Sequence, residues 1–144
     1  MPKSRSFLPD VNVWLALASE RHIHAGTCSD WLNSLESSEI VFCRVTQMGL
    51  LRLLTKEAVM GRDVLSSRDA WRTYRSILSD ARIGFAPEPF TLEQKWQELT
   101  MQNWATPNVW TDAYLAAFAR AAEFHLVTLD RAVLALDKEA LLLR

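Results

Sequence analysis

Hydrophobic positions follow two patterns along this chain, and the patterns alternate. Short apolar runs rich in strand-forming residues predict buried strands at 7–10, 39–43, 83–86, 125–128 and 141–143. Between these runs, apolar residues recur every three or four positions, which predicts helices with one buried face at 13–18, 25–35, 46–55, 67–78, 92–99 and 111–122. Strands that alternate with helices indicate a three-layer α/β/α domain with a mostly parallel sheet of four to five strands.

A few residues set where the predicted elements begin and end. Pro9 has no N–H to donate to a neighbouring strand, so pairing of the first strand should stop at about Leu8. Thr46 is the expected N-cap of the third helix. Thr91 and Gln94 have the spacing of a capping box before the fifth helix. All of these elements fit within one domain that spans residues 1–144.

Composition narrows the class of protein. Hydrophobic residues make up 49% of the chain and only four residues are glycine, so a disordered chain is excluded. The net charge of -1 argues against a surface coated in basic charge, so any polyanion must be bound locally. We expect no membrane-spanning segment and no export signal. Cys28 and Cys43 form no CxxC motif, and we expect both to be reduced core residues of a cytoplasmic protein.

Three aspartates are expected at one edge of the sheet. Asp10 closes the first strand, Asp112 lies near the start of a helix, and Asp130 follows the fourth strand. In open parallel sheets, ligands bind beyond the carboxyl ends of the strands, which is where these side chains should converge. Taken singly, an aspartate at a helix start is usually a cap, and one after a strand is usually a turn residue. Their joint placement is what favours a functional site.

Clustered carboxylates need a compensating partner. At about 5 Å, each pair repels by roughly 3 kcal/mol at an effective dielectric of about 20, so either one carboxyl holds a proton or a cation lies between them. Carboxylate oxygens suit a hard divalent ion, Mg²⁺ or Mn²⁺, which keeps open positions for water and phosphate oxygens. The reaction class that such a site indicates is phosphodiester hydrolysis.

The segments around these acids resemble a known family. Three blocks resemble the signature blocks of PIN-domain ribonucleases: Asp10-Val-Asn12, Thr111-Asp112-Ala-Tyr-Leu-Ala-Ala-Phe-Ala and Leu126-Val-Thr128-Leu-Asp130. Further segments look more closely like the VapC toxin branch: His22-Ile-His24 with Trp31-Leu32, Val45-Thr46-Gln47-Met-Gly-Leu-Leu-Arg52, and Ser67-Arg-Asp-Ala-Trp71. The resemblance covers nearly the whole chain, and the order and spacing of the blocks make it more specific than any single block.

This resemblance implies a Mg²⁺- or Mn²⁺-dependent endoribonuclease of a toxin–antitoxin pair. Such proteins cut structured RNA such as tRNA or rRNA, are usually homodimers, and are neutralised by a VapB-like antitoxin. The carboxylates implied as catalytic groups and metal ligands are Asp10, Asp112 and Asp130. Asn12 and Thr128 would hydrogen-bond to these carboxylates and orient them, and Thr111 would either do the same or cap its helix.

One departure from the family pattern lowers the charge of the expected site. PIN nucleases commonly carry a glutamate in the helix after the second strand, and Gly49 stands at that position. Gln47 is a polar neighbour but brings no charge. A second hypothesis is therefore a PIN-fold binding module with weak or no turnover, which docks an antitoxin or RNA. A phosphoacceptor receiver domain is disfavoured, because no paired acidic dipeptide follows an early strand and no lysine closes a late one.

Several other residues are candidates for contact with RNA or an antitoxin. They are Arg52, Gln47, Arg68, Arg72, Arg75 and Trp104. The segment 52–82 holds seven basic and four acidic residues, and the alternative for its arginines is a solvated helix face. Trp104 and its neighbour Trp110 flank the loop that enters the site, where they either stack on bases or pack.

Two further groups have structural alternatives. His22 and His24 lack a third ligand nearby, so a loop or contact role is favoured over a metal site. The tryptophans at helical positions are expected in the core. They are Trp14, Trp31, Trp71 and Trp96.

Overall fold

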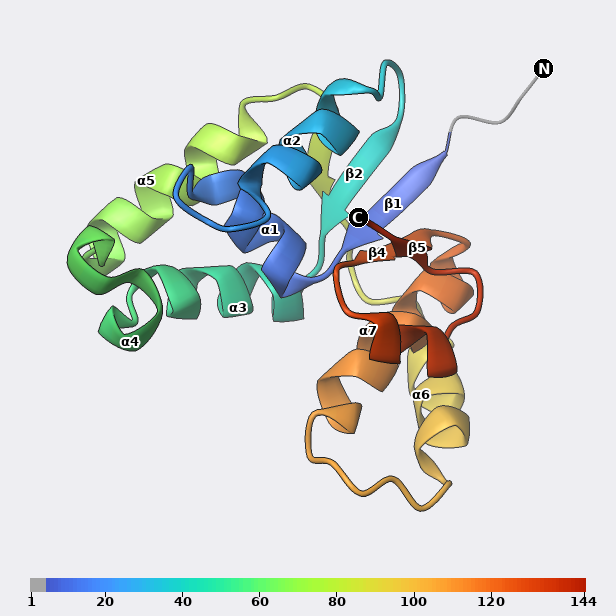
Figure 1. Cartoon of the computed structure of the whole chain (residues 1–144). Coiled ribbons are helices and arrows are strands. Elements are labelled where there is room, and N and C mark those ends of the chain that lie inside the picture. Colours follow the sequence, from blue (N-terminus) through green and yellow to red (C-terminus); the bar gives the residue numbers. More distant parts are fainter. Residues whose placement is uncertain (1–4) are drawn as a thin grey trace.

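The centre of the structure is a sheet in which every strand runs parallel to its neighbours (Figure 1). The computed structural model describes residues 5–144. The strands are β1 (Ser6–Pro9), β2 (Glu39–Phe42), β3 (Ile83–Phe85), β4 (His125–Thr128) and β5 (Leu141–Leu142), in the order β3-β2-β1-β4-β5. The predicted parallel sheet is confirmed, and β1 is its central strand.

Helices cover both faces of this sheet, which confirms the predicted three-layer arrangement (Figure 1). One face is packed by α1 (Val11–Ala18), α2 (Ala25–Asn33), α3 (Arg44–Leu54) and α5 (Ser67–Leu78). The other face is packed by α6 (Leu92–Thr100) and α7 (Val109–Ala122). The short helix α4 (Glu57–Met60) and the 3₁₀ turns η1 (Gly61–Asp63) and η2 (Arg131–Ala135) join these elements. None of the helices in residues 5–144 is long and apolar enough to cross a membrane.

Successive residues of each strand face opposite helical layers, as the two-residue period of a strand requires. Phe7 packs in the core beneath α1 and α2, whereas Leu8 packs in the core beneath α7. In the first core, Trp14 stacks on Phe42 with ring centroids 3.7 Å apart. In the second core, the small alanines of α7 allow the helix to lie close to the sheet around Phe118. Each fully buried large side chain contributes about 1.5–3 kcal/mol, so both layers hold the sheet edge in place.

Pro9 behaves as expected toward one neighbour and not toward the other. On the β2 side, pairing of β1 ends at Phe7, but on the β4 side Pro9 lies opposite Val127. The reason is that successive N–H groups of a parallel strand point to opposite neighbours. The next residue, Asp10, donates its backbone N–H to the carbonyl of Val127 at 2.9 Å, so the missing N–H of Pro9 faces β2.

One predicted helix cap is wrong, and one predicted capping box is not formed. The helix after β2 begins at Arg44 instead of Thr46, and Cys43 is its N-cap. The Thr46 hydroxyl, one turn inside the helix, instead accepts the backbone N–H of Cys43 at 3.0 Å. Thr91 is the N-cap of α6 but its side chain caps no backbone group. Spacing alone did not distinguish a cap from a residue that bonds back to it.

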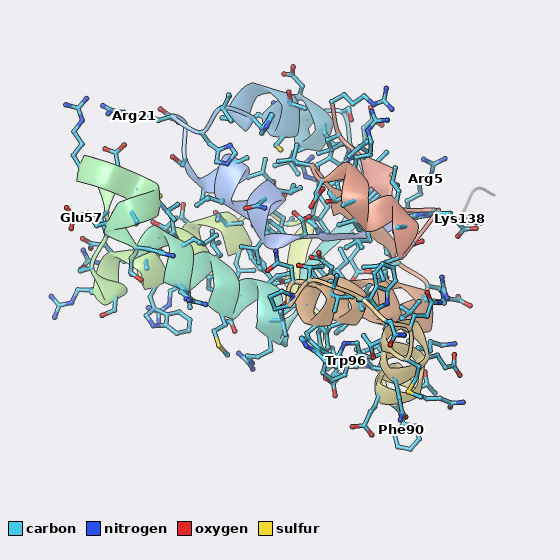
Figure 2. The ribbon with its side chains drawn as sticks, turned by 60° about the horizontal axis from the view of Figure 1, so that its bottom comes forward. Arg5, Arg21, Glu57, Phe90, Trp96 and Lys138 are labelled. Atoms are coloured by element: carbon cyan, nitrogen blue, oxygen red, sulfur yellow. The ribbon has the colours of Figure 1, made fainter. Side chains whose placement is uncertain are left out.

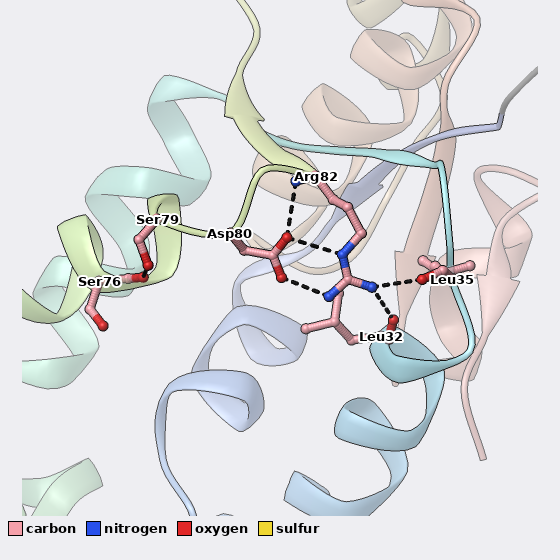
Figure 3. A network of polar contacts seen from close by, with 6 residues as sticks. All are labelled: Leu32, Leu35, Ser76, Ser79, Asp80 and Arg82. Carbon is pink, nitrogen blue, oxygen red and sulfur yellow. Dashed lines mark hydrogen bonds and ion pairs between the residues drawn. The ribbon is translucent and has the colours of Figure 1, made fainter.

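The amino edge of the sheet is fastened by a guanidinium group (Figure 3). Arg82, just before β3, donates from Nη1 to the carbonyl oxygens of Leu32 and Leu35, both at 2.7 Å. Its Nε and Nη2 donate to the two carboxylate oxygens of Asp80 at 3.0 and 2.6 Å. Arg82 therefore satisfies carbonyls at the end of α2 and ties that end to the start of β3.

Candidate active site

Asp10 is held at the junction of β1 and α1. It is the N-cap of α1, and its Oδ1 accepts the backbone N–H of Val13 at 3.1 Å. Its own backbone N–H is used by the carbonyl of Val127, so both the main chain and the side chain are fixed. The capping role that the sequence left open for a lone aspartate is present, and the carboxylate has a second contact besides it.

That second contact comes from Thr128, at the end of β4. The buried Thr128 hydroxyl donates to Asp10 Oδ2 at 2.6 Å. The same hydroxyl oxygen accepts the backbone N–H of Asp130 at 3.0 Å. Asp130 Oδ1 in turn accepts the N–H of Ala132 and starts η2. The hydroxyl of Thr128 therefore links Asp130 to Asp10, which lies 118 residues before Thr128 in the sequence.

Asp112 completes the group from the other helical layer. It lies in the first turn of α7, where its backbone N–H donates to the carbonyl of Asn108 at 3.1 Å. Its carboxylate has no hydrogen-bond donor from the protein anywhere between Arg5 and the C-terminal Arg144. The three predicted acids thus reach the same edge of the sheet, and Asp112 is the one whose side chain is held least.

The pKa values of Asp10 and Asp112 are both shifted upward. Burial raises the pKa of Asp10 above its usual value, and the negative charge of Asp112 acts in the same direction, while hydrogen bonds from Thr128 and Val13 oppose the rise. Burial also raises the pKa of Asp112, with a further contribution from the charge of Asp130. No positive side chain contributes to either shift. The edge therefore carries negative charge that the protein leaves uncompensated.

A divalent cation would supply that compensation, and the donors suit one. Carboxylate and hydroxyl oxygens are the ligands that Mg²⁺ and Mn²⁺ prefer. As the side chains lie, however, no three His, Cys, Asp or Glu residues in the described part of the chain are close enough together to hold a metal ion. The residues fit such an ion in chemistry and charge, and the carboxylate of Asp112 is the one that accepts no hydrogen bond from the described residues.

The side chains of two predicted orienting residues form no hydrogen bond to the acids within residues 5–144. The exposed Asn12 side chain has no hydrogen-bond partner among the described residues, although its backbone N–H supports Asp10. It lines a hollow of about 350 Å³ near the ion pair of Arg21 with Asp63. Thr111 is exposed and does not cap α7, because the N-cap position belongs to Asn108. Of the three predicted orienting side chains, Thr128 alone makes the expected contact.

The structure gives a steric reason for glycine at position 49. A Cβ on Gly49 would lie 2.6 Å from Cγ2 and 3.3 Å from Cγ1 of Val11, which is the residue after Asp10. Val11 is β-branched and its χ1 angle is stiff, so the methyl groups cannot easily move aside. Helix α3 therefore packs against the first turn of α1 so closely that Val11 fills the place of a side chain at 49, and the sequence offered no signal of this contact.

Gln47 has an inward role. Its side chain is buried, with 7% exposed, and its Oε1 accepts a hydrogen bond from Nη1 of Arg44. The Arg44 guanidinium lies 4.7 Å from the centre of the Phe85 ring, at the end of β3. Gln47 thus positions the exposed Arg44 near the carboxyl edge instead of reaching the surface itself. The sequence analysis did not identify Arg44 as a candidate. The only sequence feature that pointed to it is a positive charge directly after the apolar strand of residues 39–43.

The predicted basic residues are on the surface, and one core prediction is wrong. Arg52, Arg68, Arg72 and Arg75 are exposed. Arg72 pairs loosely with Asp69 at 3.5 Å. Trp71, expected in the core, is 43% exposed and lines a groove between α3 and α5 with Met48 and Arg52. Periodicity put Trp71 on the inner face of α5, but Ala70 and Tyr74 are the residues of this helix that are buried in the core.

Tryptophans of the α6–α7 region are fixed by their indole nitrogens. Trp104 donates its Nε1–H to the carbonyl of Leu99 at 3.0 Å and keeps 36% of its surface exposed. Trp96 donates to the carbonyl of Trp110 at 2.9 Å. Trp14 is fully buried as predicted, whereas Trp31 and Trp96 are half-buried against the two cores.

The histidines and cysteines do not add metal ligands. The backbone N–H of His24 donates to Nδ1 of His22 at 3.0 Å, which occupies that nitrogen. Burial, together with the nearby His24, lowers the pKa of His22. Cys28 and Cys43 are both buried and reduced, as predicted. Burial and the charge of Asp10 raise the pKa of Cys28 to about 11, so this thiol stays protonated at neutral pH.

Comparisons with known proteins show which family this chain is similar to. The PIN domain family model matches residues 7–139. Ribonuclease VapC41 of Mycobacterium tuberculosis is 44% identical over 130 residues, which cover 87% of this chain and 89% of that protein. The crystal structure of VapC20 from M. tuberculosis, a Sarcin-Ricin loop cleaving toxin, has a TM-score of 0.65 at 16% identity and covers 91% of this chain and 95% of its own. VapBC2 of Rickettsia felis, bound to a promoter DNA fragment, has a TM-score of 0.70 at 14% identity, with 94% and 96% covered. At these identities the two structures show the shared fold alone.

Proposed function

Because this chain belongs to the PIN-domain family and to its VapC group, we propose that it is a metal-dependent endoribonuclease toxin that cuts structured RNA and is neutralised by an antitoxin. The observation that carries the proposal is the hydroxyl of Thr128, which joins Asp10 to the backbone of Asp130. An edge built only for stability would pair these acids with basic groups. Here, Asp10 and the backbone of Asp130 share the hydroxyl of Thr128, and neither aspartate forms an ion pair among residues 5–144.

The proposed cofactor is Mg²⁺ or Mn²⁺, held by Asp10, Asp112 and Asp130. Bound there, such an ion would polarise the scissile phosphate and lower the pKa of an attacking water. The remaining roles belong to the chain itself. The Thr128 hydroxyl donates to one oxygen of Asp10 and the backbone N–H of Val13 donates to the other, so the orientation of the carboxylate is fixed. Asp112, which no protein donor holds, adapts to what is bound.

Structured RNA is the proposed substrate class. The exposed arginines Arg52, Arg68, Arg72 and Arg75 lie on α3 and α5, and Arg44 is held at the start of α3 by Gln47. Guanidinium groups bind phosphates, and their release of counterions predicts an affinity that falls steeply with salt. VapC20 is described as a Sarcin-Ricin loop cleaving toxin, which supports an RNA loop of rRNA or tRNA as the target.

A VapB-like antitoxin is the proposed partner, and a homodimer is the proposed assembly. A toxin–antitoxin complex from Klebsiella pneumoniae has the same fold at a TM-score of 0.59, which supports a partner protein for this chain. Light scattering on the purified chain tests the dimer, and a monomeric mass at every concentration would contradict it.

Cleavage assays on tRNA and rRNA fragments test the activity. We expect cleavage with Mg²⁺ or Mn²⁺ that stops on addition of EDTA and in Asp10→Asn and Asp112→Asn. Asp30→Asn is the matched control, because Asp30 is an exposed carboxylate on α2, away from the acid edge. Unchanged cleavage by either site variant would rule out the proposed metal site.

Gly49 favours a second candidate, a binding module with little turnover, because this position brings no fourth carboxylate. Calorimetry with Mn²⁺ separates the two. The nuclease should show saturable binding at millimolar metal or below, which Asp112→Asn abolishes, whereas the module should show none.

A further inference from the structure

A hollow on the outer side of α6 and α7 is not part of the acid site. Its volume is about 380 Å³, and it is lined by Glu93, Trp96, Gln97, Thr100 and Trp110. The first four residues lie on one face of α6, and Trp110 comes from the first turn of α7. In Figure 2, Trp96 lies beside the ribbon of α7 on the side of the molecule turned to the viewer. We call this hollow the tryptophan pocket.

The walls of the tryptophan pocket are fixed before anything binds. The indole N–H of Trp96 donates to the carbonyl of Trp110 at 2.9 Å, and the two rings meet edge to face with centroids 6.2 Å apart. The Thr100 hydroxyl donates back to the carbonyl of Trp96 at 2.8 Å. Trp96 also packs edge-on against Tyr114 at 5.6 Å. A ligand therefore pays little ordering entropy to use these aromatic surfaces.

The polar group left for a ligand is a carboxylate. Glu93 is exposed and forms neither an ion pair nor a side-chain hydrogen bond within the described range. Behind the aromatic wall, Tyr114 donates to Glu88 at 2.8 Å, which brings a second negative charge to this side. Lys95 lies on the same helix but does not line the pocket. Aromatic faces beside a carboxylate attract a guanidinium or ammonium group and repel a phosphate.

We propose that the tryptophan pocket receives an arginine or lysine side chain of the protein partner that covers the acid edge. The proposal rests on the antitoxin partner of the proposed function. Trp110 and Asp112 both lie in the first turn of α7, on opposite sides of the helix. A partner segment that starts at the acid edge therefore reaches the pocket by crossing over the start of α7. The 56% exposed surface of Trp110 would be covered by the alkyl stem of that side chain.

A short peptide tests the pocket without any partner protein. The probe is acetyl-Ala-Arg-Ala-amide, and its twin with citrulline in place of arginine keeps the shape but lacks the charge. The readout is the shift of the indole N–H resonances in NMR spectra, assigned to Trp96 and Trp110 with single Trp→Phe variants. We expect the arginine peptide to shift both resonances saturably and the citrulline peptide to leave them in place.

Paired carboxamide variants locate the charge that binds the probe. Glu93→Gln should weaken peptide binding at least about fivefold, which corresponds to about 1 kcal/mol, the scale of an exposed cation–π and carboxylate contact. Glu98→Gln removes an exposed charge of the same helix that does not line the pocket, and it should leave the affinity unchanged. Equal weakening by both variants, or no effect of either, would overturn the proposal.

The same NMR spectra distinguish other possible occupants of the tryptophan pocket. Shifts of the two resonances by a uridine pentanucleotide but not by the peptide would assign the pocket to RNA and overturn the proposal. Shifts that grow with protein concentration alone would assign it to a second copy. RNA cleavage by Glu93→Gln should match that of the unchanged chain.

Cleavage assays separate the pocket proposal from the proposed function. If peptide binding fails while Asp10→Asn and Asp112→Asn lose cleavage, only the pocket proposal falls. Retained cleavage in those variants removes the proposed metal site instead.

Discussion

The two edges of the sheet hold their carboxylates in opposite ways. At the amino edge, Asp80 lies against the Arg82 guanidinium, and the hydrogen bonds from Arg82 lower its pKa to about 2. At the carboxyl edge, Asp10 and Asp112 are half-buried near each other and their pKa values are raised. The first arrangement is what folding stability favours, and the second costs stability. The contrast is that Asp80 has a basic partner within the chain, whereas no positive side chain offsets the raised pKa values of Asp10 and Asp112.

The largest expected effect separates activity from stability. Asp112→Asn should lower RNA cleavage at least about 100-fold, since it removes a group that holds the proposed ion. In metal-free buffer it should also raise the free energy of unfolding by up to about 1 kcal/mol. The sign follows from the raised pKa of Asp112: its ionised form is disfavoured in the folded chain, so the cost is present at neutral pH and disappears when the charge is removed. Urea unfolding and cleavage assays measure the two effects. Lower stability in metal-free buffer would contradict the uncompensated charge.

Thr128→Val should give the next largest effect. It leaves Asp10 Oδ2 and the Asp130 backbone N–H without the hydroxyl that serves both. We expect Mn²⁺ affinity to fall about 10- to 100-fold, with a loss of about 1–3 kcal/mol in unfolding free energy. Thr128→Ser keeps the hydroxyl and is the matched control. If the valine variant binds Mn²⁺ as tightly as the serine variant, the hydroxyl does not position the acids.

Substitution of two glycines tests how tightly α3 packs against Val11, the residue after Asp10. Gly49→Ala should lose about 1–2 kcal/mol in unfolding free energy, because overpacking against Val11 exceeds the gain in helix propensity. Gly26→Ala, on α2, meets nothing within 4 Å among the described residues and should gain about 0.5–1 kcal/mol. Adding Val11→Ala to Gly49→Ala should recover stability, as thermal or urea unfolding would show. Losses that simply add would contradict the steric contact.

The smallest expected effect is the contribution of Asp80, paired with Arg82, to the free energy of unfolding, and this contribution depends on pH. The folded pKa of Asp80, about 2, lies below its ordinary value of 3.8, so its contribution is present above about pH 4 and is lost as the pH falls through 2. We expect roughly 1 kcal/mol from this partly exposed pair. Asp80→Asn should lose that stability at pH 7 and flatten the dependence between pH 4 and 2, while RNA cleavage stays unchanged. A steeper acid dependence in the variant would refute the pairing.

The sequence predicted the carboxyl edge better than the contacts behind it. The order of strands and helices brings Asp10, Asp112 and Asp130 to one edge, and this order can be read from hydrophobic periodicity. Likewise, Thr128 at the end of β4 lies close to Asp10, which follows the neighbouring strand β1. These inferences need only the direction of each element, which local patterns determine.

The missed features depend on contacts between elements far apart in sequence. Periodicity gives the inner face of a helix but not which neighbour covers it, so Trp71 was expected to be buried. In the same way, the choice of Gly49 is explained by Val11 of another helix. The pairing of Pro9 depends on which neighbour its missing N–H faces. None of these contacts leaves a local pattern in the chain.

The Thr128 bridge also has a consequence for the order of synthesis. Asp10 is translated 118 residues before Thr128, yet the two side chains are hydrogen-bonded in the folded chain. Because β4 also supplies one neighbour of the central strand, β1 stays unpaired on that side until residues 125–128 have emerged from the ribosome. A nascent chain therefore cannot bring Asp10 and Asp130 together before β4 has been made. Stalled chains that end before residue 125 should show no RNA cleavage, which ribosome-bound assays can measure.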